Sequence, residues 1–242
     1  LFFITQQTIL KKKIIINIII RNGYKYICQE NENCKSLDEY RRVIEFLSKN
    51  GCNKNSAIVS IGGGTVTDLC GFVASSYMRG IAHILIPTTL LGMVDAAIGG
   101  KTALNIQGIR NLIGSYKNPD AIIIYTTFIN SLNKNDMING YAEIIKYALI
   151  MDKKLFTKIE ENIDKLLSNT NLSFIKTIIG TCINHKLNIV NQDQYDEGIR
   201  NILNFGHTVG HALEGFLNFE IPHGVAVLHG MHVASYLSYK KK

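Results

Sequence analysis

The stretch SAIVSIGGGTVTD occupies residues 56–68 and decides the fold of the first part of the chain. Its first half, residues 56–61, is mostly apolar and predicts a buried strand, and three glycines follow before a helix-like run. Working outward, residues 36–49 have helical spacing, and residues 81–86 and 121–125 predict further buried strands. Buried strands separated by helices are typical of a parallel sheet. We therefore predict an α/β N-terminal part with a parallel sheet.

The strand signal fades after about residue 135, and helical spacing takes over. Helices are predicted over residues 136–149, 153–167, 172–190 and 200–217. The expected organisation is an α/β domain over residues 1–134, followed by a mainly α-helical domain over 135–242. The chain begins with Leu1 and stops in three lysines just after an apolar stretch. We expect a fragment, truncated at both ends.

Composition excludes several classes of protein. The 242 residues are 46% hydrophobic and 19% charged, with a net charge of +7, which is typical of a globular protein. No basic helix interleaved with aromatic residues is found, so we expect no nucleic acid partner and assign the basic surplus to small phosphate-bearing ligands. The apolar run at 14–20 is too short to span a bilayer, so no membrane association is expected. Five cysteines without CxxC spacing favour a reduced, cytoplasmic protein.

Two glycine-containing motifs lie in the α/β part. After the strand at 56–61, Gly62, Gly63 and Gly64 let the backbone approach a pyrophosphate at a helix N-terminus, or they make only a tight turn. The stretch PTTLLGMVDAAIGGKT, residues 87–102, places paired threonines after a buried strand and Lys101 after two glycines. It fits either a loop that binds a phosphorylated ligand or a helix N-cap with an ordinary loop.

The strongest signal is NFGHTVGH, residues 204–211, which puts His207 and His211 four residues apart. On a helix both project from one face, as two metal ligands or as a ligand plus a proton carrier. His223 follows in Pro-His-Gly, and an apolar helix upstream carries Glu143 and Lys146 at i and i+3. Two histidines and one carboxylate, with a position left open for substrate oxygens, is a catalytic zinc arrangement. The other histidines are assigned structural roles: His83, His185, His229 and His232.

In combination these motifs resemble the 3-dehydroquinate synthase family. The residues that carry the resemblance lie at 62–80, 87–105, 110–116, 140–150, 196–214 and 222–224. The resemblance implies an NAD-binding α/β domain joined to a helical metal-binding domain in a cytoplasmic homodimer. It implies Zn²⁺, with Co²⁺ as a substitute, bound by Glu143, His207 and His223.

The resemblance also implies the remaining site residues. The NAD contacts would be Glu32, Lys35, Gly63, Gly64, Asp68, Thr88, Thr89, Lys101, Arg110, Phe128 and Ser131. The substrate contacts would be Arg79 reaching the neighbouring subunit, Asp95, Lys101, Asn111, Lys146, Lys186, Arg200, Asn204 and His211. Among these, Asp95, Lys101, Lys146 and His211 would be catalytic, which leaves His211 on the substrate side rather than on the metal.

The implied reaction is that of a carbon–oxygen lyase of the shikimate pathway, which serves aromatic amino acid biosynthesis. 3-Deoxy-D-arabino-heptulosonate 7-phosphate is oxidised transiently by NAD, loses phosphate by elimination, is reduced again and closes by an intramolecular aldol step to 3-dehydroquinate. Three alternatives remain open: another sugar-phosphate cyclase, a metal-dependent alcohol or glycerol dehydrogenase, and an inactive truncated chain.

Overall fold

The computed structural model describes residues 1–11, 23–167, 172–218 and 220–241. The apolar run at 14–20, interpreted as too short to span a bilayer, lies outside these residues. In the part that is described, no helix combines the length and the apolar character needed to cross a membrane. The chain forms two compact units: unit 1 is Leu1–Gly92 with Ala96–Tyr125, and unit 2 is Met93–Asp95 with Thr126–Lys242. The assignment of NAD to residues 1–134 and of metal and substrate to 135–242 stays a prediction.

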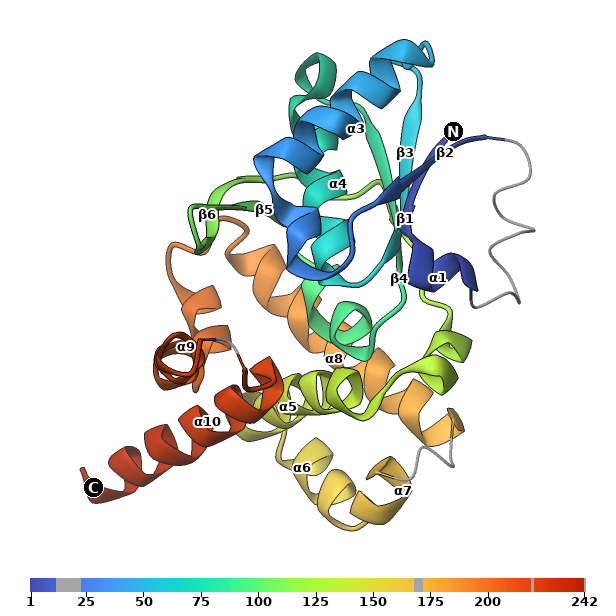
Figure 1. The fold of residues 1–242 in the computed structure, drawn as a ribbon. Coiled ribbons are helices and arrows are strands. Elements are labelled where there is room, and N and C mark those ends of the chain that lie inside the picture. The colour runs from blue at the N-terminus through green and yellow to red at the C-terminus, as the bar shows by residue number, and fades with distance from the viewer. Residues whose placement is uncertain (12–22, 168–171, 219, 242) are drawn as a thin grey trace. The chain divides into compact units, whose positions relative to one another are not determined.

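Unit 1 is built on a parallel sheet (Figure 1). In the described residues its strand order is β2-β1-β3-β4-β7, and every neighbouring pair is parallel. The strands are β1 (Phe2–Gln6), β2 (Tyr24–Cys28), β3 (Ala57–Gly62), β4 (Ala82–Pro87) and β7 (Ala121–Ile122). The predicted parallel sheet is thus confirmed, although the strand expected over 121–125 is shorter than predicted.

Helix α4 (Gly64–Ser76) makes the core of unit 1, because it packs against β3 and β4 and buries seven of its side chains or glycines. Helix α3 (Leu37–Lys49) packs outside it and begins at Ser36, whose hydroxyl accepts the Glu39 N–H at 3.1 Å. This cap satisfies one of the amide groups that the first turn leaves unpaired. The other helical segments in the described residues of this unit are α1 (Gln7–Lys11), η1 (Asn31–Lys35) and η2 (Tyr77–Arg79).

The turn from β3 to α4 contains the predicted glycines. A Cβ on Gly62 would lie 2.5 Å from a methyl group of Val66, so the strand can reach the helix this closely only with glycine there. Gly63 is the N-cap of α4 and has no side chain to cap it. The first amide groups of α4 therefore lie beside a glycine turn, which suits an anionic ligand.

The sequence missed a hairpin in unit 1. Strands β5 (Lys101–Ile106) and β6 (Ile109–Tyr116) pair antiparallel where a loop was expected after Gly99 and Gly100. Gln107 and Gly108 form the turn, and both have positive φ, of 50° and 79°. Two such residues between strands match the right-handed twist of a hairpin.

Unit 2 is helical, as predicted. Where the structure describes this unit, its helices are η4 (Thr126–Ser131), α5 (Lys134–Met151), α6 (Lys153–Glu160), α7 (Ile163–Leu167), α8 (Leu172–Gln192), η5 (Ile199–Asn204), α9 (His207–Phe216) and α10 (His223–Lys240). A short π-helical segment, η3 (Gly92–Ala96), contributes Asp95 to this unit. Two predicted helices are wrong as single elements: 153–167 is α6 and α7, and 200–217 is η5 and α9.

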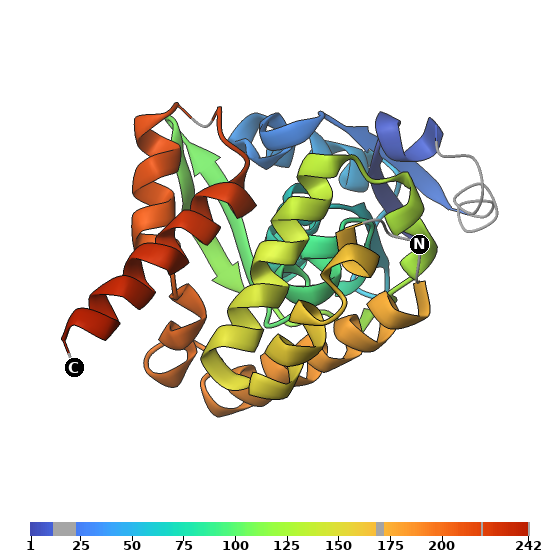
Figure 2. The ribbon, with the colours of Figure 1, turned by 90° about the horizontal axis from the view of Figure 1, so that it is seen from below.

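Gly206 explains the break between η5 and α9. It adopts a φ of 81°, and a Cβ there would lie 2.7 Å from the Met231 nitrogen of α10. A Cβ on Gly230 would in turn collide with the Gly206 carbonyl oxygen. These glycines let the backbones of α9 and α10 approach closely, as Figures 1 and 2 show, and so bring His207 to the start of a helix beside α10.

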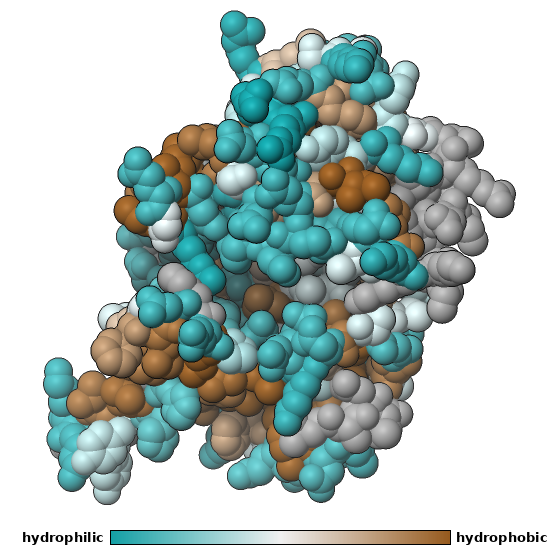
Figure 3. Space-filling model, in the orientation of Figure 1, coloured by the Kyte–Doolittle hydropathy of each residue, from teal (hydrophilic) through white to brown (hydrophobic). Residues whose placement is uncertain are grey.

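Helix α10 is buried only in its first half, where Gly224, Ala226, Val227, Gly230 and Met231 are covered. Beyond Met231 the helix exposes apolar and aromatic side chains, namely Val233, Tyr236, Leu237 and Tyr239. Hydrophobic residues are visible at the surface in this part of Figure 3. The first half of α10 is therefore the part that packs against the rest of unit 2.

We expect His83 to make the stability of the protein depend on pH. Its ring is buried, its Nε2 lies 3.2 Å from the Ser60 hydroxyl oxygen, and burial lowers its pKa to about 4 from 6.5. The folded state thus favours the neutral ring. The free energy of unfolding should fall as pH drops from 6.5 to 4, by about 3 kcal/mol, because the unfolded chain binds the proton first.

The measurement is urea denaturation of the unmodified chain and of His83→Gln at several pH values in this range. His83→Gln should lack this part of the pH dependence, whereas His229→Gln, at an exposed histidine of α10, should keep it. Equal pH dependence in His83→Gln and the unmodified chain would show that His83 does not carry the effect.

Candidate metal centre

Three helices of unit 2 bring together the residues predicted to bind metal. Glu143 comes from the middle of α5, and His207 and His223 are the first residues of α9 and α10. Glu143 Oε1 lies 3.4 Å from His207 Nε2 and 3.9 Å from His223 Nε2. The donor atoms of the three side chains all lie within 4.8 Å of one another. Residues 143, 207 and 223, far apart in the sequence, thus form one cluster.

The cluster fits a zinc ion. Zinc bound to nitrogen or oxygen at its usual distances separates tetrahedral donors by about 3.3–3.5 Å, close to the two separations measured from Glu143. Both carboxylate oxygens of Glu143 are buried and form no hydrogen bond of good geometry. Among the described residues, their ion-pair neighbours are Lys146, His207 and His223. A buried carboxylate needs a cation, and two imidazole nitrogens beside it suit a divalent metal.

A second group of charges lies next to the metal ligands. Asp95 Oδ1 accepts hydrogen bonds from Lys186 Nζ, at 2.7 Å, and from the Tyr147 hydroxyl. Lys146 Nζ lies 4.0 Å from the same oxygen and pairs with Glu143. Both lysines are buried, so two carboxylates and two ammonium groups balance one another within unit 2. Three residues predicted to contact substrate, Asp95, Lys146 and Lys186, are therefore linked to the metal ligands by the ion pair between Lys146 and Glu143.

Burial and charge oppose each other in this cluster. Burial alone would raise the pKa of Glu143, but the Lys146 ammonium and His207 outweigh it and leave the pKa below its ordinary value. The pKa of Asp95 likewise lies well below its usual range, because Lys186 and Lys146 overcome the effect of burial. Burial lowers the pKa of Lys186, and Asp95 offsets this in part. Both carboxylates are thus held ionised.

Tyr147 was not predicted as a site residue, yet it supports Asp95. Its hydroxyl donates to a buried, ionised carboxylate, and such hydrogen bonds stabilise proteins more than neutral ones. We expect Tyr147→Phe to lower the free energy of unfolding by about 1.5–3 kcal/mol, measured by urea denaturation. Tyr195→Phe, at an exposed tyrosine, is the control and should change it far less. Equal stability of Tyr147→Phe and the unmodified chain would contradict this role.

His211 and Glu214 lie on α9 beside the metal ligands. The His211 ring centroid is 5.3 Å from that of His207 and 6.0 Å from that of His223, and the His211 side chain is exposed. Glu214, which the sequence analysis missed, is 3% exposed and accepts a hydrogen bond from His223 Nδ1 at 3.1 Å. Its signal was present, because Glu214 lies seven residues after His207 and three after His211, on the same helix face.

Arg200 and Asn204 lie in η5, not in the α-helix expected there. Arg200 is buried and donates from Nη1 to the Gln194 carbonyl oxygen at 2.5 Å. Asn204 is exposed and donates to Asn201 Oδ1 at 3.4 Å. Their predicted contacts with substrate stay predictions.

In unit 1 the predicted nucleotide residues gather at the carboxyl ends of β3 and β4. The Thr88 N–H donates to the Gly62 carbonyl oxygen at 2.9 Å, and a Cβ on Gly63 would lie 3.0 Å from the Thr89 methyl group. The Thr88 hydroxyl is buried and has no hydrogen-bond partner in the part of the chain that the structure describes. Ligands of open α/β sheets bind at this end of the strands, where an unsatisfied hydroxyl and bare glycines offer a polar cradle.

A second set of predicted residues forms a chain of contacts in unit 1. Lys35 Nζ lies 2.6 Å from Asp68 Oδ2 and 2.5 Å from Asn111 Oδ1. Glu32 accepts a hydrogen bond from Asn105 at 2.7 Å. Asn111, predicted to bind substrate, thus lies with residues predicted to bind NAD. Burial raises the pKa of Asp68, which the Lys35 charge partly offsets.

The remaining predicted residues are placed as follows. Arg79 ends η2 with a φ of 61° and is exposed, Lys101 begins β5, and Arg110 lies in β6. Phe128 and Ser131 lie in η4, where the Ser131 hydroxyl donates to the Phe128 carbonyl oxygen at 2.7 Å.

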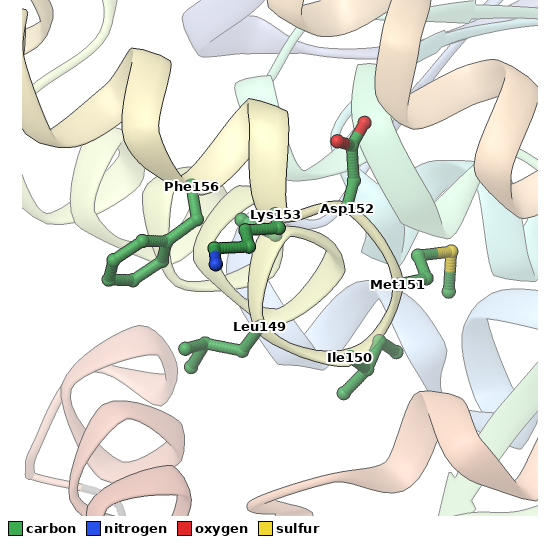
Figure 4. A pocket seen from close by; sticks show the side chains of 7 residues that line it. Leu149, Ile150, Met151, Asp152, Lys153 and Phe156 are labelled. Carbon is green, nitrogen blue, oxygen red and sulfur yellow. The ribbon is translucent and has the colours of Figure 1, made fainter.

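A pocket of about 490 Å³ lies where α5 ends and α6 begins (Figure 4). It contains none of the predicted site residues. Its labelled side chains point in different directions rather than toward a common centre, and Asp152 is already used, since it caps α6 and pairs with His185. This pocket is therefore separate from the metal ligands.

Comparison with known proteins matches both parts of the chain. A family model described as 3-dehydroquinate synthase N-terminal matches residues 25–139, and one described as 3-dehydroquinate synthase C-terminal matches residues 140–242. A 3-dehydroquinate synthase of Clostridium tetani (strain Massachusetts / E88) is 42% identical over 241 residues, which are 98% of this chain. The chain spans 64% of the length of that relative.

Solved structures with the same fold carry both cofactors. One is the 2-epi-5-epi-valiolone synthase of Streptomyces hygroscopicus subsp. jinggangensis 5008, solved with NAD⁺ and Zn²⁺ bound. It matches this chain with a TM-score of 0.85 and 26% sequence identity, and the match covers 95% of this chain and 66% of the synthase chain. A 2-deoxy-scyllo-inosose synthase complexed with carbaglucose-6-phosphate, NAD⁺ and Co²⁺ has a TM-score of 0.83 and 28% identity, over 95% of this chain and 64% of its own.

Proposed function

Since this chain belongs to the 3-dehydroquinate synthase family, we propose that its protein converts 3-deoxy-D-arabino-heptulosonate 7-phosphate to 3-dehydroquinate and phosphate. The observation that carries the proposal is the meeting of Glu143, His207 and His223 in unit 2. The proposed activity is that of a carbon–oxygen lyase, and it requires NAD and a divalent metal, Zn²⁺ or Co²⁺.

Glu143, His207 and His223 would hold the metal, and the glycine turn with Thr88 and Thr89 would hold NAD. When bound, the metal supplies a Lewis acid for substrate oxygens and NAD supplies a reversible hydride acceptor. The support for NAD in this chain is the bare N-terminus of α4 together with the unsatisfied Thr88 hydroxyl.

The other residues of the cluster orient and neutralise the substrate. The charges of Asp95, Glu143, Lys146 and Lys186 cancel, so a bound divalent cation leaves a positive excess that attracts a phosphorylated carboxylic acid. Lys186 and Tyr147 hold the Asp95 carboxylate, whose remaining lone pairs can accept a substrate hydroxyl. The exposed His211 lies on the open side of the metal ligands, where it can exchange a proton with substrate.

A second cyclase activity is less well supported. The valiolone synthase, solved with Zn²⁺, and the inosose synthase, solved with Co²⁺, share the fold but only 26% and 28% identity, against 42% for the Clostridium tetani 3-dehydroquinate synthase. Lys186 and Arg200, both buried cations, favour a substrate that carries a carboxylate as well as a phosphate.

We include a homodimer and a cytoplasmic location in the proposal. The exposed Arg79, whose backbone is held in a left-handed turn, suits a side chain that reaches the site of a neighbouring subunit. The five cysteines are buried free thiols, as in a reducing compartment.

The test is phosphate release from the heptulosonate phosphate by the protein that contains this chain, with its zinc and after treatment with a chelator. We expect release that needs zinc and NAD and no net formation of NADH. Release of NADH with an alcohol substrate would indicate a dehydrogenase, and absence of phosphate release from the zinc- and NAD-loaded protein would refute the proposal.

A further inference from the structure

We propose that Glu214 is a positioning residue, which holds the His223 imidazole so that its Nε2 faces the metal. This inference rests on the proposed metal centre and adds to it a residue that the predicted ligand set lacks. Glu214 is buried on α9, seven residues after the ligand His207, and its carboxylate reaches across to the first residue of α10.

The two nitrogens of His223 face two different carboxylates. Nδ1 lies 3.1 Å from Glu214 Oε2, and Nε2 lies 3.9 Å from Glu143 Oε1. An ionised carboxylate can only accept a hydrogen bond, so the proton of a neutral ring must sit on Nδ1. The lone pair of Nε2 is then directed toward Glu143 and His207, where the metal would bind.

The backbone of His223 is fixed separately. The Gly224 N–H donates to Asn139 Oδ1 of α5 at 2.8 Å, and a Cβ on Gly224 would lie 2.6 Å from the Ile138 carbonyl oxygen. This close contact holds the start of α10 against the helix that carries Glu143. The contact with Asn139 thus fixes the backbone position of His223, and the hydrogen bond to Glu214 fixes the orientation of its imidazole ring.

The same geometry allows an alternative role for Glu214, that of a metal ligand, which the experiment must distinguish from the positioning role. Donor atoms of His211, Glu214 and His223 also lie within 4.8 Å of one another, so Glu214 could itself be a ligand of a metal bound on the exposed side. We favour the positioning role because Glu143 is the more deeply buried carboxylate and its Oε1 faces the Nε2 atoms of both His207 and His223, whereas Glu214 is hydrogen-bonded to His223 Nδ1.

The test compares Glu214→Ala and Glu214→Gln with Glu220→Gln, a control at an exposed glutamate three residues before His223. Zinc affinity is measured by competition with a chelating indicator, and the visible spectrum of the Co²⁺-loaded protein reports the coordination. Glu214→Ala should bind zinc about 10–100-fold more weakly and alter the Co²⁺ spectrum, as expected when the partner of a ligating histidine is lost. Glu214→Gln, whose amide oxygen still accepts the Nδ1 proton, should recover most of the affinity, and Glu220→Gln should match the unmodified protein.

Three results would overturn the inference. Unchanged zinc affinity in Glu214→Ala would show that the contact does not support the site. An equal loss in Glu214→Gln and Glu214→Ala would show that hydrogen-bond acceptance is not the cause. Complete loss of zinc in Glu214→Ala, with zinc retained in His207→Ala, would make Glu214 a ligand. If the unmodified protein binds no zinc, the proposed function itself is refuted. This result differs from the three above, in which the unmodified protein binds zinc and only the role of Glu214 is refuted.

Discussion

His207→Ala is expected to abolish stoichiometric zinc and, with it, phosphate release. His207 Nε2 lies 3.4 Å from the buried Glu143 carboxylate, and without this ring the metal would keep only Glu143 and His223. Loss of a ligand should exceed the 10–100-fold drop in metal affinity that follows loss of a ligand's partner, so we expect a drop of more than about 100-fold. Elemental analysis of the purified, dialysed variant measures the zinc content.

The matched control is His229→Ala, on an exposed face of α10 away from its first turn. It should keep one zinc per chain. Full zinc content in His207→Ala, or loss of zinc in His229→Ala, would contradict the ligand assignment.

Lys146→Met is expected to reduce turnover by about 10²–10³-fold while zinc is retained. Lys146 is a buried cation that pairs with Glu143 and faces Asp95 at 4.0 Å, and removal of one preorganised group that stabilises developing charge has an effect of this size. Zinc should be held at least as tightly, because the substitution removes a positive charge beside a cation. Methionine keeps most of the volume of the side chain.

Steady-state kinetics of phosphate release, together with zinc content, measure both effects. Lys154→Met, at an exposed position of α6, is the control and should behave as the unmodified protein. Normal turnover in Lys146→Met would remove this lysine from the site, and loss of zinc would show that it acts on the metal ligands instead.

The order of elements could be predicted because it depends on local patterns. The apolar run before Gly62 predicted β3 to within a residue, and the spacing of His207 and His211 placed both on one helix. The hairpin of β5 and β6 was missed because β6 is mostly exposed and lacks a buried alternating face. Its one local signal was the Gln107-Gly108 turn.

The site was predictable as a set of residues but not as a geometry. The break at Gly206 depends on the close approach of Met231, which is distant in the sequence. The pairing of Glu214 with His223 likewise requires α9 to pack on α10, and the contact of Tyr147 with Asp95 requires η3 to join unit 2. Such contacts follow from packing between elements, which a single sequence does not display.

The most direct test is an anomalous difference map, at the zinc edge, of crystals of the zinc-loaded protein. We predict one strong peak within about 2.0–2.2 Å of a Glu143 carboxylate oxygen, His207 Nε2 and His223 Nε2. A peak held instead by His211 and Glu214, or no peak at Glu143, would contradict the proposed metal centre.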